Sequence, residues 1–145
     1  MEIRDMRYSD LEQIVQLEKV CFSDPWSLPM LEPELTNPLS LWLVVVEGSL
    51  VLGYIGSQTV LDASDIMNVA VHPQYRRQGV AQKLVEALSS RLSEKKVRFL
   101  SLEVRASNEP AIALYERNGF STVGVRPGYY RHPKEDARIM RKELI

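Results

Sequence analysis

The spacing of apolar residues predicts a strand and two helices near the start of the chain. Residues 2–6 form a short candidate strand. Apolar side chains over residues 11–20 then recur at helical spacing, and the Ser-x-x-Glu pattern of Ser9 and Glu12 predicts a capping box at the start of this helix. A second short helix is expected over residues 27–35, although two prolines weaken it.

The pattern then changes to runs rich in Val, Ile and Leu, which favour strands. Three such runs, at residues 41–46, 51–60 and 66–71, are separated by turn-forming residues, so they predict three strands joined as hairpins. The next segment, residues 79–95, places its apolar side chains on one stripe. This stripe predicts a helix that packs on the sheet.

The rest of the chain completes a mixed sheet. A strand, a helix and two more strands are expected, in that order, at residues 97–104, 110–117, 121–125 and 137–142. Asn118 and Gly119 stop the helix, and the loop between the last two strands contains Tyr129 and Tyr130. The order βααβββαβαββ predicts an α/β fold class, a mixed α+β sheet with helices on its faces, formed by residues 1–145 as a single domain.

Composition and charge exclude several classes of protein. The 145 residues are 45% hydrophobic and 26% charged, which is typical of a globular domain. Eighteen Lys and Arg against nineteen Asp and Glu give a net charge of -1, which argues against general nucleic-acid binding. The first seven residues lack the apolar core of a signal peptide, and the longest apolar run, residues 41–46, is far below the roughly 18 residues of a membrane span.

The cysteine and histidine content predicts a reducing compartment and no metal site. One cysteine, Cys21, makes neither an internal disulfide nor a cysteine zinc cluster, so a cytoplasmic location is expected. Cys21 itself follows a helix and is expected to be a small buried residue. His72 and His132 each precede a proline and share no ligand spacing with carboxylates.

The junction at residues 71–81 runs from a strand through a basic turn into a helix. Free amides at a helix N-terminus favour a phosphate, and Arg76 and Arg77 add positive charge before Gly79. Neither the Walker pattern nor Gly-x-Gly-x-x-Gly is present, which argues against an NTPase or a nicotinamide enzyme. Taken alone, Arg-x-x-Gly-x-Ala is a weak motif that also fits an ordinary helix start.

Two further runs give this junction a context. Residues 68–81 read NVAVHPQYRRQGVA, residues 102–108 read LEVRASN and residues 111–120 read AIALYERNGF. Together they resemble the GNAT superfamily of acetyl-CoA-dependent acetyltransferases and, within it, the RimI group of ribosomal-protein-alanine N-acetyltransferases. The likeness covers almost the whole chain and is weakest over residues 27–65.

The resemblance implies acetyl-CoA as co-substrate and assigns roles to individual residues. In the family, the strand at residues 69–71 holds the pantetheine arm and the amides near residues 77–82 take the pyrophosphate. The cofactor-binding residues implied are Val69, Ala70, Val71, Arg76, Arg77, Gln78, Gly79, Val80, Ala81, Gln82 and Asn108. Glu103 matches the general base and Tyr115 the general acid. Trp26, Tyr129 and Tyr130 belong to the segments that wall the peptide groove.

These residue types suit acetyl transfer to an α-amine. An α-amino group has a pKa of about 7.7–8.0 against about 10.4 for lysine, so a modest base such as Glu103 suffices. A tyrosine with a pKa near 10 can protonate a thiol of pKa about 8.5, which suits Tyr115 to the leaving group. Direct transfer then needs no covalent enzyme intermediate.

The expected function is therefore acetylation of a protein N-terminal peptide, in particular the N-terminal alanine of a small-subunit ribosomal protein, by a monomer or weak dimer. The same chemistry on an internal lysine, a polyamine or another small molecule remains open. So does a non-catalytic acyl-CoA-binding module, although binding alone needs neither Glu103 nor Tyr115. Considered singly, Glu103 also fits a solvated strand residue, Tyr115 a packed ring, and Tyr129 and Tyr130 ordinary loop packing.

Overall fold

The computed structural model describes residues 1–144, and their elements follow the predicted order. The strands and α-helices are β1 (Glu2–Asp5), α1 (Leu11–Cys21), α2 (Leu28–Leu31), β2 (Ser40–Glu47), β3 (Leu50–Val60), β4 (Ala63–Val71), α3 (Val80–Glu94), β5 (Phe99–Arg105), α4 (Glu109–Arg117), β6 (Ser121–Arg131) and β7 (Lys134–Glu143). They form one seven-stranded sheet in the order β1-β2-β3-β4-β5-β7-β6. The predicted α/β fold class is confirmed.

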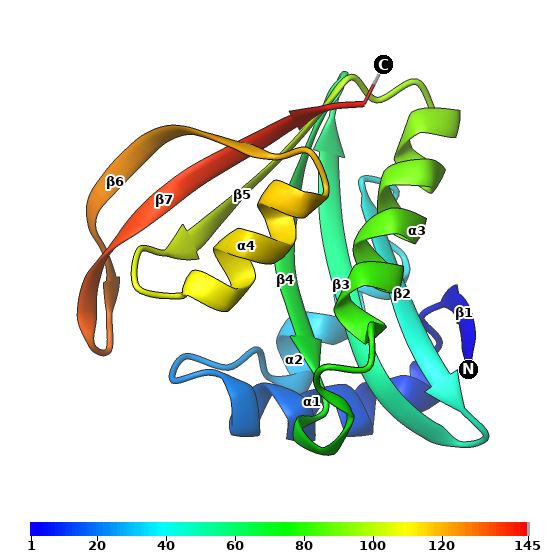
Figure 1. Ribbon diagram of the computed structural model, residues 1–145. Coiled ribbons are helices and arrows are strands. Elements are labelled where there is room, and N and C mark those ends of the chain that lie inside the picture. The colour runs from blue at the N-terminus through cyan, green and yellow to red at the C-terminus, as the bar shows by residue number, and fades with distance from the viewer. Residues whose placement is uncertain (145) are drawn as a thin grey trace.

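Helices cover both faces of the sheet. Helices α3 and α4 lie on the near face in Figure 1 and contribute Val80, Leu84 and Ile112 to one core cluster. Helices α1 and α2 contribute Leu11 and Leu31 to a second cluster on the opposite face. Alternate residues of β2 point into the two clusters, which explains why its apolar run is continuous rather than alternating.

The sheet is split between its two central strands. All neighbouring strands are antiparallel except β4 and β5, which pair in parallel only from Ala63 to Asp65 and from Phe99 to Ser101. Beyond this point they diverge (Figure 1). The register between β3 and β4 shifts at Met67, because Gly56 pairs with Asn68 and Ser57 with Ile66. A bulge increases local strand twist, so this extra residue turns β4 away from β5 where their pairing ends.

Two local predictions near the start of the chain were wrong or incomplete. The expected Ser9–Glu12 capping box is absent, because a 3-10 turn at Tyr8–Asp10 precedes α1. The Asp10 carboxylate instead accepts hydrogen bonds from the Arg7 backbone N–H at 2.7 Å and from the Arg4 guanidinium at 2.8 and 2.9 Å. The single helix expected over residues 27–35 is α2 followed by a 3-10 turn at Glu32–Leu35.

The last hairpin is longer than predicted. Tyr129 and Tyr130 lie in β6 rather than in a loop, since Tyr130 pairs with Glu135 and Arg131 with Lys134 across the hairpin. A register shift between Arg126 and Tyr130 absorbs the residues that do not fit a regular strand. None of the described helices is long and apolar enough to cross a membrane.

Candidate active site

Two clefts meet where β4 and β5 diverge. We call the first the hairpin cleft; it is lined by the segment after α1, by β4, by β5, by the start of α4 and by the β6–β7 hairpin. We call the second the helix cleft; it is lined by the end of β4, the N-terminus of α3 and one side of α4. Their volumes are about 540 and 640 Å³, which suits small-molecule or peptide binding. Val69, Asn108 and Tyr115 line both, so the clefts are continuous.

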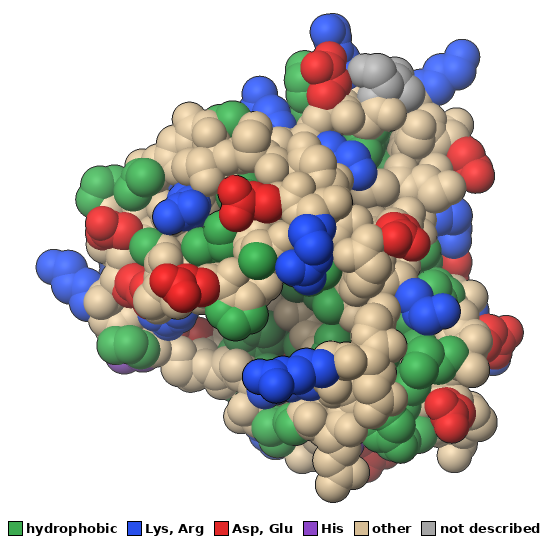
Figure 2. All heavy atoms as spheres, viewed as in Figure 1, with side chains coloured by type: hydrophobic (Ala, Val, Ile, Leu, Met, Phe, Trp, Pro, Cys, Tyr) green, Lys and Arg blue, Asp and Glu red, His purple; other side chains and the backbone are tan. Residues whose placement is uncertain are grey.

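The helix cleft carries positive charge and free backbone donors. Arg76, Arg77 and Arg117 line it, and no acidic side chain is among the described residues of its wall. Figure 2 shows the hollow at the centre of this face, with hydrophobic side chains inside and Lys or Arg side chains at its rim. Gly79 is the N-cap of α3 and provides no side-chain cap, so the first amides of the helix are free for an anion.

The turn before α3 has the backbone that such a site needs. Arg77 and Gly79 both have positive φ, 63° and 81°, and successive turn amides of this kind form an anion-binding concavity. A side chain on Gly79 would meet no atom within 4 Å, so its absence leaves open space in front of the helix. The sequence signal of a phosphate site is thus matched by local geometry.

The backbone of β4 turns polar groups toward the gap between β4 and β5. The His72 N–H donates to the Leu52 carbonyl at 2.7 Å, which fixes the side of β4 that pairs with β3. Because antiparallel pairing alternates along a strand, the N–H and C=O groups of Val69 and Val71 point the other way, toward the gap. The Val69 N–H donates to Asn68 Oδ1 at 3.2 Å, and the Val71 carbonyl accepts from Cys21 Sγ at 3.9 Å. The Val69 carbonyl and the Val71 N–H are left to bind an extended ligand as a missing strand would.

The structure brings nearly all predicted cofactor-binding residues together. The helix cleft is lined by Val69, Ala70, Val71, Arg76, Arg77, Gly79, Val80, Ala81, Gln82 and Asn108. Gln78 is the exception, because it does not line the cleft and its side chain donates to the Gln74 carbonyl at 3.5 Å. Asn108 also caps α4, since its side chain accepts from the Ala111 N–H at 3.3 Å.

Glu103 and Tyr115 both line the hairpin cleft from different elements. Glu103 lies on β5, and its Oε1 accepts a hydrogen bond from Arg126 Nε at 3.2 Å. Tyr115 lies on α4 with its ring edge-to-face on Phe120, 5.5 Å between centroids. Burial, with a smaller effect of the nearby Tyr130, raises the pKa of the Tyr115 hydroxyl well above its usual range. Its hydroxyl therefore stays protonated at neutral pH.

The three predicted acceptor-binding aromatics also line the hairpin cleft. Trp26 packs edge-to-face on Trp42 with 5.4 Å between ring centroids. The rings of Tyr129 and Tyr130 are perpendicular, 5.0 Å apart, with Tyr129 exposed and Tyr130 half-buried. Burial, with a smaller contribution from Tyr129, raises the pKa of Tyr130 to about 12.

A buried carboxylate supports this cleft from behind, and sequence reasoning missed it. Glu18 of α1 is 1% exposed; it accepts hydrogen bonds from the Trp26 N–H at 2.8 Å, from Asn68 Nδ2 at 2.7 Å and from the Tyr54 hydroxyl. Glu18 follows Ile14 by four residues and so lies on the buried face of the helix, which was the available signal. The Glu18 carboxylate thus fixes two residues of the cleft wall.

Cys21 does not have the buried place expected of it. Its side chain is partly exposed and lines both clefts, with Arg76 Nη2 3.5 Å from the sulfur. Helix α1 ends at Cys21, and the segment that follows turns toward the clefts. The Glu18 carboxylate holds this segment through the backbone N–H of Trp26. Among the described residues, no group of three or more His, Cys, Asp or Glu could hold a metal ion.

Comparisons with known proteins agree with this geometry. The acetyltransferase (GNAT) family model matches residues 11–120. The ribosomal protein bS18-alanine N-acetyltransferase of Escherichia coli (strain K12) is 36% identical over 140 residues, which is 95% of this chain and 94% of that protein. The crystal structure of the ribosomal-protein-S18-alanine N-acetyltransferase from Escherichia coli has a TM-score of 0.91 at 34% identity and covers 99% of this chain and 93% of that chain.

The chain belongs to the GNAT acetyltransferase family. The family predicted from the three sequence runs is confirmed, and with it the class of enzyme, an acetyl-CoA-dependent N-acetyltransferase. Arabidopsis thaliana NAA60 in complex with acetyl-CoA shares the fold, with a TM-score of 0.88 at 21% identity over 98% of this chain and 97% of that chain.

The helix cleft of this GNAT enzyme fits the co-substrate of the family. Acetyl-CoA is an anion with an extended amide-containing arm. The arginines and free amides at the start of α3 suit its phosphates, and the outward-facing backbone of β4 suits its arm. The wall of the hairpin cleft includes Arg105 and two carboxylates, Asp24 and Glu103, and the carboxylates suit an amine.

Proposed function

We propose that this GNAT enzyme transfers the acetyl group of acetyl-CoA to the α-amino group of a protein N-terminus, and that its acceptor is the N-terminal alanine of ribosomal protein S18. The main observation behind this proposal is that the two clefts are continuous at the split between β4 and β5. The helix cleft suits an anionic acyl donor, and the hairpin cleft suits an amine. The named activity of the Escherichia coli relative supports the choice of acceptor.

The proposed reaction is a direct attack with one proton removed and one delivered. The neutral amine attacks the thioester carbonyl carbon, a C–N bond forms and the C–S bond breaks. Glu103 accepts the proton that the amine loses, directly or through one water, and the Tyr115 hydroxyl donates a proton to the leaving sulfur. The outward-facing N–H of Val71 on β4 stabilises the negative charge on the carbonyl oxygen. Water then returns the proton from Glu103 to Tyr115.

The environments of the two residues support these roles. Glu103 is partly exposed at 27% and has one ion-pair partner, so a second carboxylate oxygen is left for the amine. Tyr115 is 4% exposed and its pKa is raised by burial, so its hydroxyl keeps its proton throughout the pH range in which an α-amine loses one.

A cytoplasmic site of action follows from the proposed acceptor, because a ribosomal protein is made and assembled there. The single free cysteine agrees with a reducing compartment. The acceptor would be a free protein tail, which needs no basic nucleic-acid-binding surface on the enzyme.

The test is an acceptor panel. The protein is mixed with acetyl-CoA and short peptides with the S18 N-terminal sequence, the same sequence blocked at its α-amine, and the same sequence with lysine as the one free amine. We expect thiol release with the free α-amine alone, and mass spectrometry to place the acetyl group on alanine. Acetylation of lysine, or no turnover on any N-terminal peptide, would refute the proposed acceptor.

A further inference from the structure

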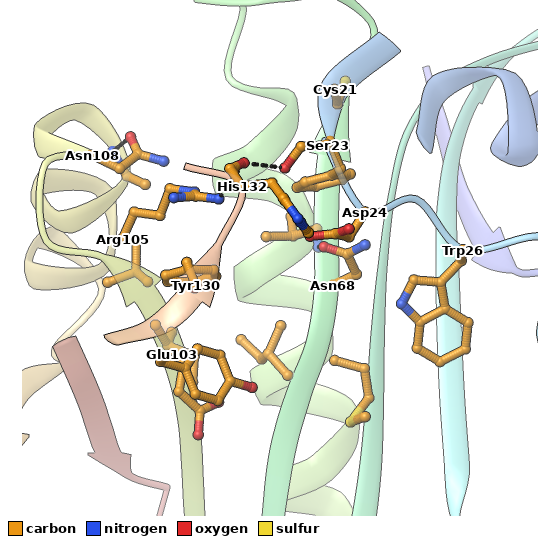
Figure 3. Close-up of a pocket in the computed structure, with 18 of the residues that line it drawn as sticks. Cys21, Ser23, Asp24, Trp26, Asn68, Glu103, Arg105, Asn108, Tyr130 and His132 are labelled. Atoms are coloured by element: carbon orange, nitrogen blue, oxygen red, sulfur yellow. Dashed lines mark hydrogen bonds and ion pairs between the residues drawn. The ribbon is translucent and has the colours of Figure 1, made fainter. Parts of the chain in front are cut away.

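Arg105 joins three parts of the hairpin cleft. It lies on β5, two residues after Glu103, and its guanidinium donates to the Pro133 carbonyl at 2.9 Å, to the His132 carbonyl at 3.1 Å and to Glu135 Oε1 at 3.2 Å. Figure 3 shows its side chain reaching toward His132, with the Tyr130 ring beside it and Glu103 beyond. One side chain therefore connects the strand of the proposed base to the turn of the β6–β7 hairpin.

The guanidinium also fixes an aromatic ring. Arg105 Cζ lies 4.3 Å from the centroid of the Tyr130 ring, which is the distance of a cation–π contact. Glu135, which pairs with Arg105, accepts a hydrogen bond from the Ser107 N–H at 2.6 Å and so ties the hairpin to the loop before α4. The ring has a defined position because both its own strand and Arg105 hold it.

The far side of the cleft meets the same turn. Ser23 Oγ donates to the His132 carbonyl at 2.6 Å, so one carbonyl oxygen accepts donors from opposite walls (Figure 3). His132 Nδ1 lies 3.3 Å from Asp24 Oδ2. Arg105 therefore holds the turn where it borders the mouth of the cleft.

Arg98, just before the other end of β5, provides an internal comparison. It too pairs with a glutamate, Glu143, at 3.4 Å, and its Cζ lies 5.1 Å from the Phe99 ring centroid. That pair is 55% and 57% exposed, whereas the Arg105–Glu135 pair is 25% and 19% exposed. Arg98 lines neither cleft. It therefore has the same kinds of partner as Arg105, a glutamate and an aromatic ring, but lies away from the proposed site.

We propose that Arg105 is a positioning residue for the acceptor: it holds the Tyr130 ring and the β6–β7 turn against the cleft and so sets peptide affinity. This inference rests on the proposed function, since the peptide is the ligand of the hairpin cleft. Its role is confined to that cleft, because Arg105 does not line the helix cleft. A lysine cannot replace it, since a planar fork is needed to reach two carbonyls and a carboxylate while stacking on a ring.

The test compares Arg105→Gln and Arg105→Lys with the matched control Arg98→Gln. For both Arg105 variants we expect the peptide KM to rise about tenfold while the acetyl-CoA KM stays at its wild-type value, as expected for a cation held by several polar contacts. The same kinetics in a Tyr130→Leu background measure the coupling between Arg105 and Tyr130. In that background we expect Arg105→Gln to change the logarithm of the peptide KM by less than half of its change in the wild-type background. Arg98→Gln should match wild type in both KM values.

Hydrogen exchange supplies a readout that needs no acceptor. In Arg105→Gln, amides of residues 128–135 should exchange faster than in wild type and in Arg98→Gln. An unchanged peptide KM, a rise in both KM values together, rescue by lysine, or full additivity with Tyr130→Leu would each overturn the proposal. If wild type acetylates no peptide, the proposed function fails, and unchanged exchange at the hairpin then overturns the positioning role separately.

Discussion

Two buried glutamates should respond to pH in opposite directions. Burial raises the pKa of Glu18, and the hydrogen bonds from Tyr54 and the Trp26 N–H lower it by less. Burial would also raise the pKa of Glu34, but hydrogen bonds from four side chains outweigh that effect and the pKa is lowered. The donors to Glu34 are Gln58, Trp42, Ser40 and Asn37. We therefore compare Glu18→Gln with Glu34→Gln.

The magnitudes follow from the hydrogen bonds. The Glu18 oxygens accept from three donors, so an amide at this position leaves one buried donor unsatisfied, at a cost of about 1–3 kcal/mol. In Glu34→Gln the amide oxygen can still serve the three donors on Oε1, and the amide nitrogen then faces Asn37. Loss of that bond and of the charge should also cost about 1–3 kcal/mol.

The signs of the pH dependence differ. For Glu18 the folded state binds more protons than the unfolded state above pH 4.5, so the wild type loses stability as pH rises through the raised pKa, by about 1.4 kcal/mol for each pH unit by which the pKa is raised. The Glu18→Gln variant has no such loss. The difference in free energy of unfolding between this variant and the wild type should therefore shrink as pH rises. For Glu34 the stabilisation is complete above the unfolded value of 4.5 and is lost as pH falls through the lowered pKa.

Urea unfolding monitored by tryptophan fluorescence measures the free energy of unfolding of each variant and of the wild type at several pH values from 5 to 8. We expect the difference from the wild type to narrow with rising pH for Glu18→Gln and to stay constant for Glu34→Gln. As pH falls below 4.5 and through the lowered pKa of Glu34, the difference in free energy of unfolding between Glu34→Gln and the wild type should narrow. A Glu18→Gln difference that widens with pH would show that the ionised carboxylate is favoured by its donors, which would refute the reasoning from burial.

Three other substitutions test the packing and the two clefts. Gly56→Ala would place a Cβ against ring atoms of Trp42, closer than van der Waals contact allows, and should lower the free energy of unfolding by about 1–3 kcal/mol, as measured by urea denaturation; an unchanged midpoint would show that the ring has room to move. Arg77→Gln should raise the acetyl-CoA KM about tenfold and leave the peptide KM unchanged, and the reverse pattern would contradict the assignment of the helix cleft. Tyr115→Phe should lower kcat about a hundredfold with an unchanged circular dichroism spectrum, and wild-type kcat would exclude it as the acid.

The element order was predictable because each segment has a clear hydrophobic period. The run at residues 41–46 reads as a strand buried on both faces, which is its place in the sheet. The extension of β6 to Arg131 was not predictable, because Pro127 and Gly128 interrupt the strand pattern and a register shift absorbs them. Strand pairing across the hairpin, which sequence periodicity does not report, decides the outcome.

Some parts of the site were likewise predictable from the sequence, and others were not. Much of the helix cleft comes from one continuous segment, residues 69–82, so arginines followed by glycine and a helix start predicted it once the two other sequence runs gave them a context. The support behind the hairpin cleft joins Glu18 to Asn68, 50 residues apart, and no local pattern predicts that contact. The roles proposed for Glu103 and Tyr115 rest on family resemblance, since a strand glutamate and a helix tyrosine carry no such signal alone.

The split between β4 and β5 also makes the stability of the fold depend on ligand concentration. It creates two strand edges inside the sheet, and each edge lacks the backbone hydrogen bonds that a neighbouring strand would provide. A ligand arm that supplies those hydrogen bonds binds the folded chain and not the unfolded one, so its concentration enters the unfolding equilibrium. At a hundred times its Kd, such a ligand adds about 2.7 kcal/mol to stability. The abundance of intact enzyme in a cell would then follow the level of its acyl donor, even where no acceptor is present.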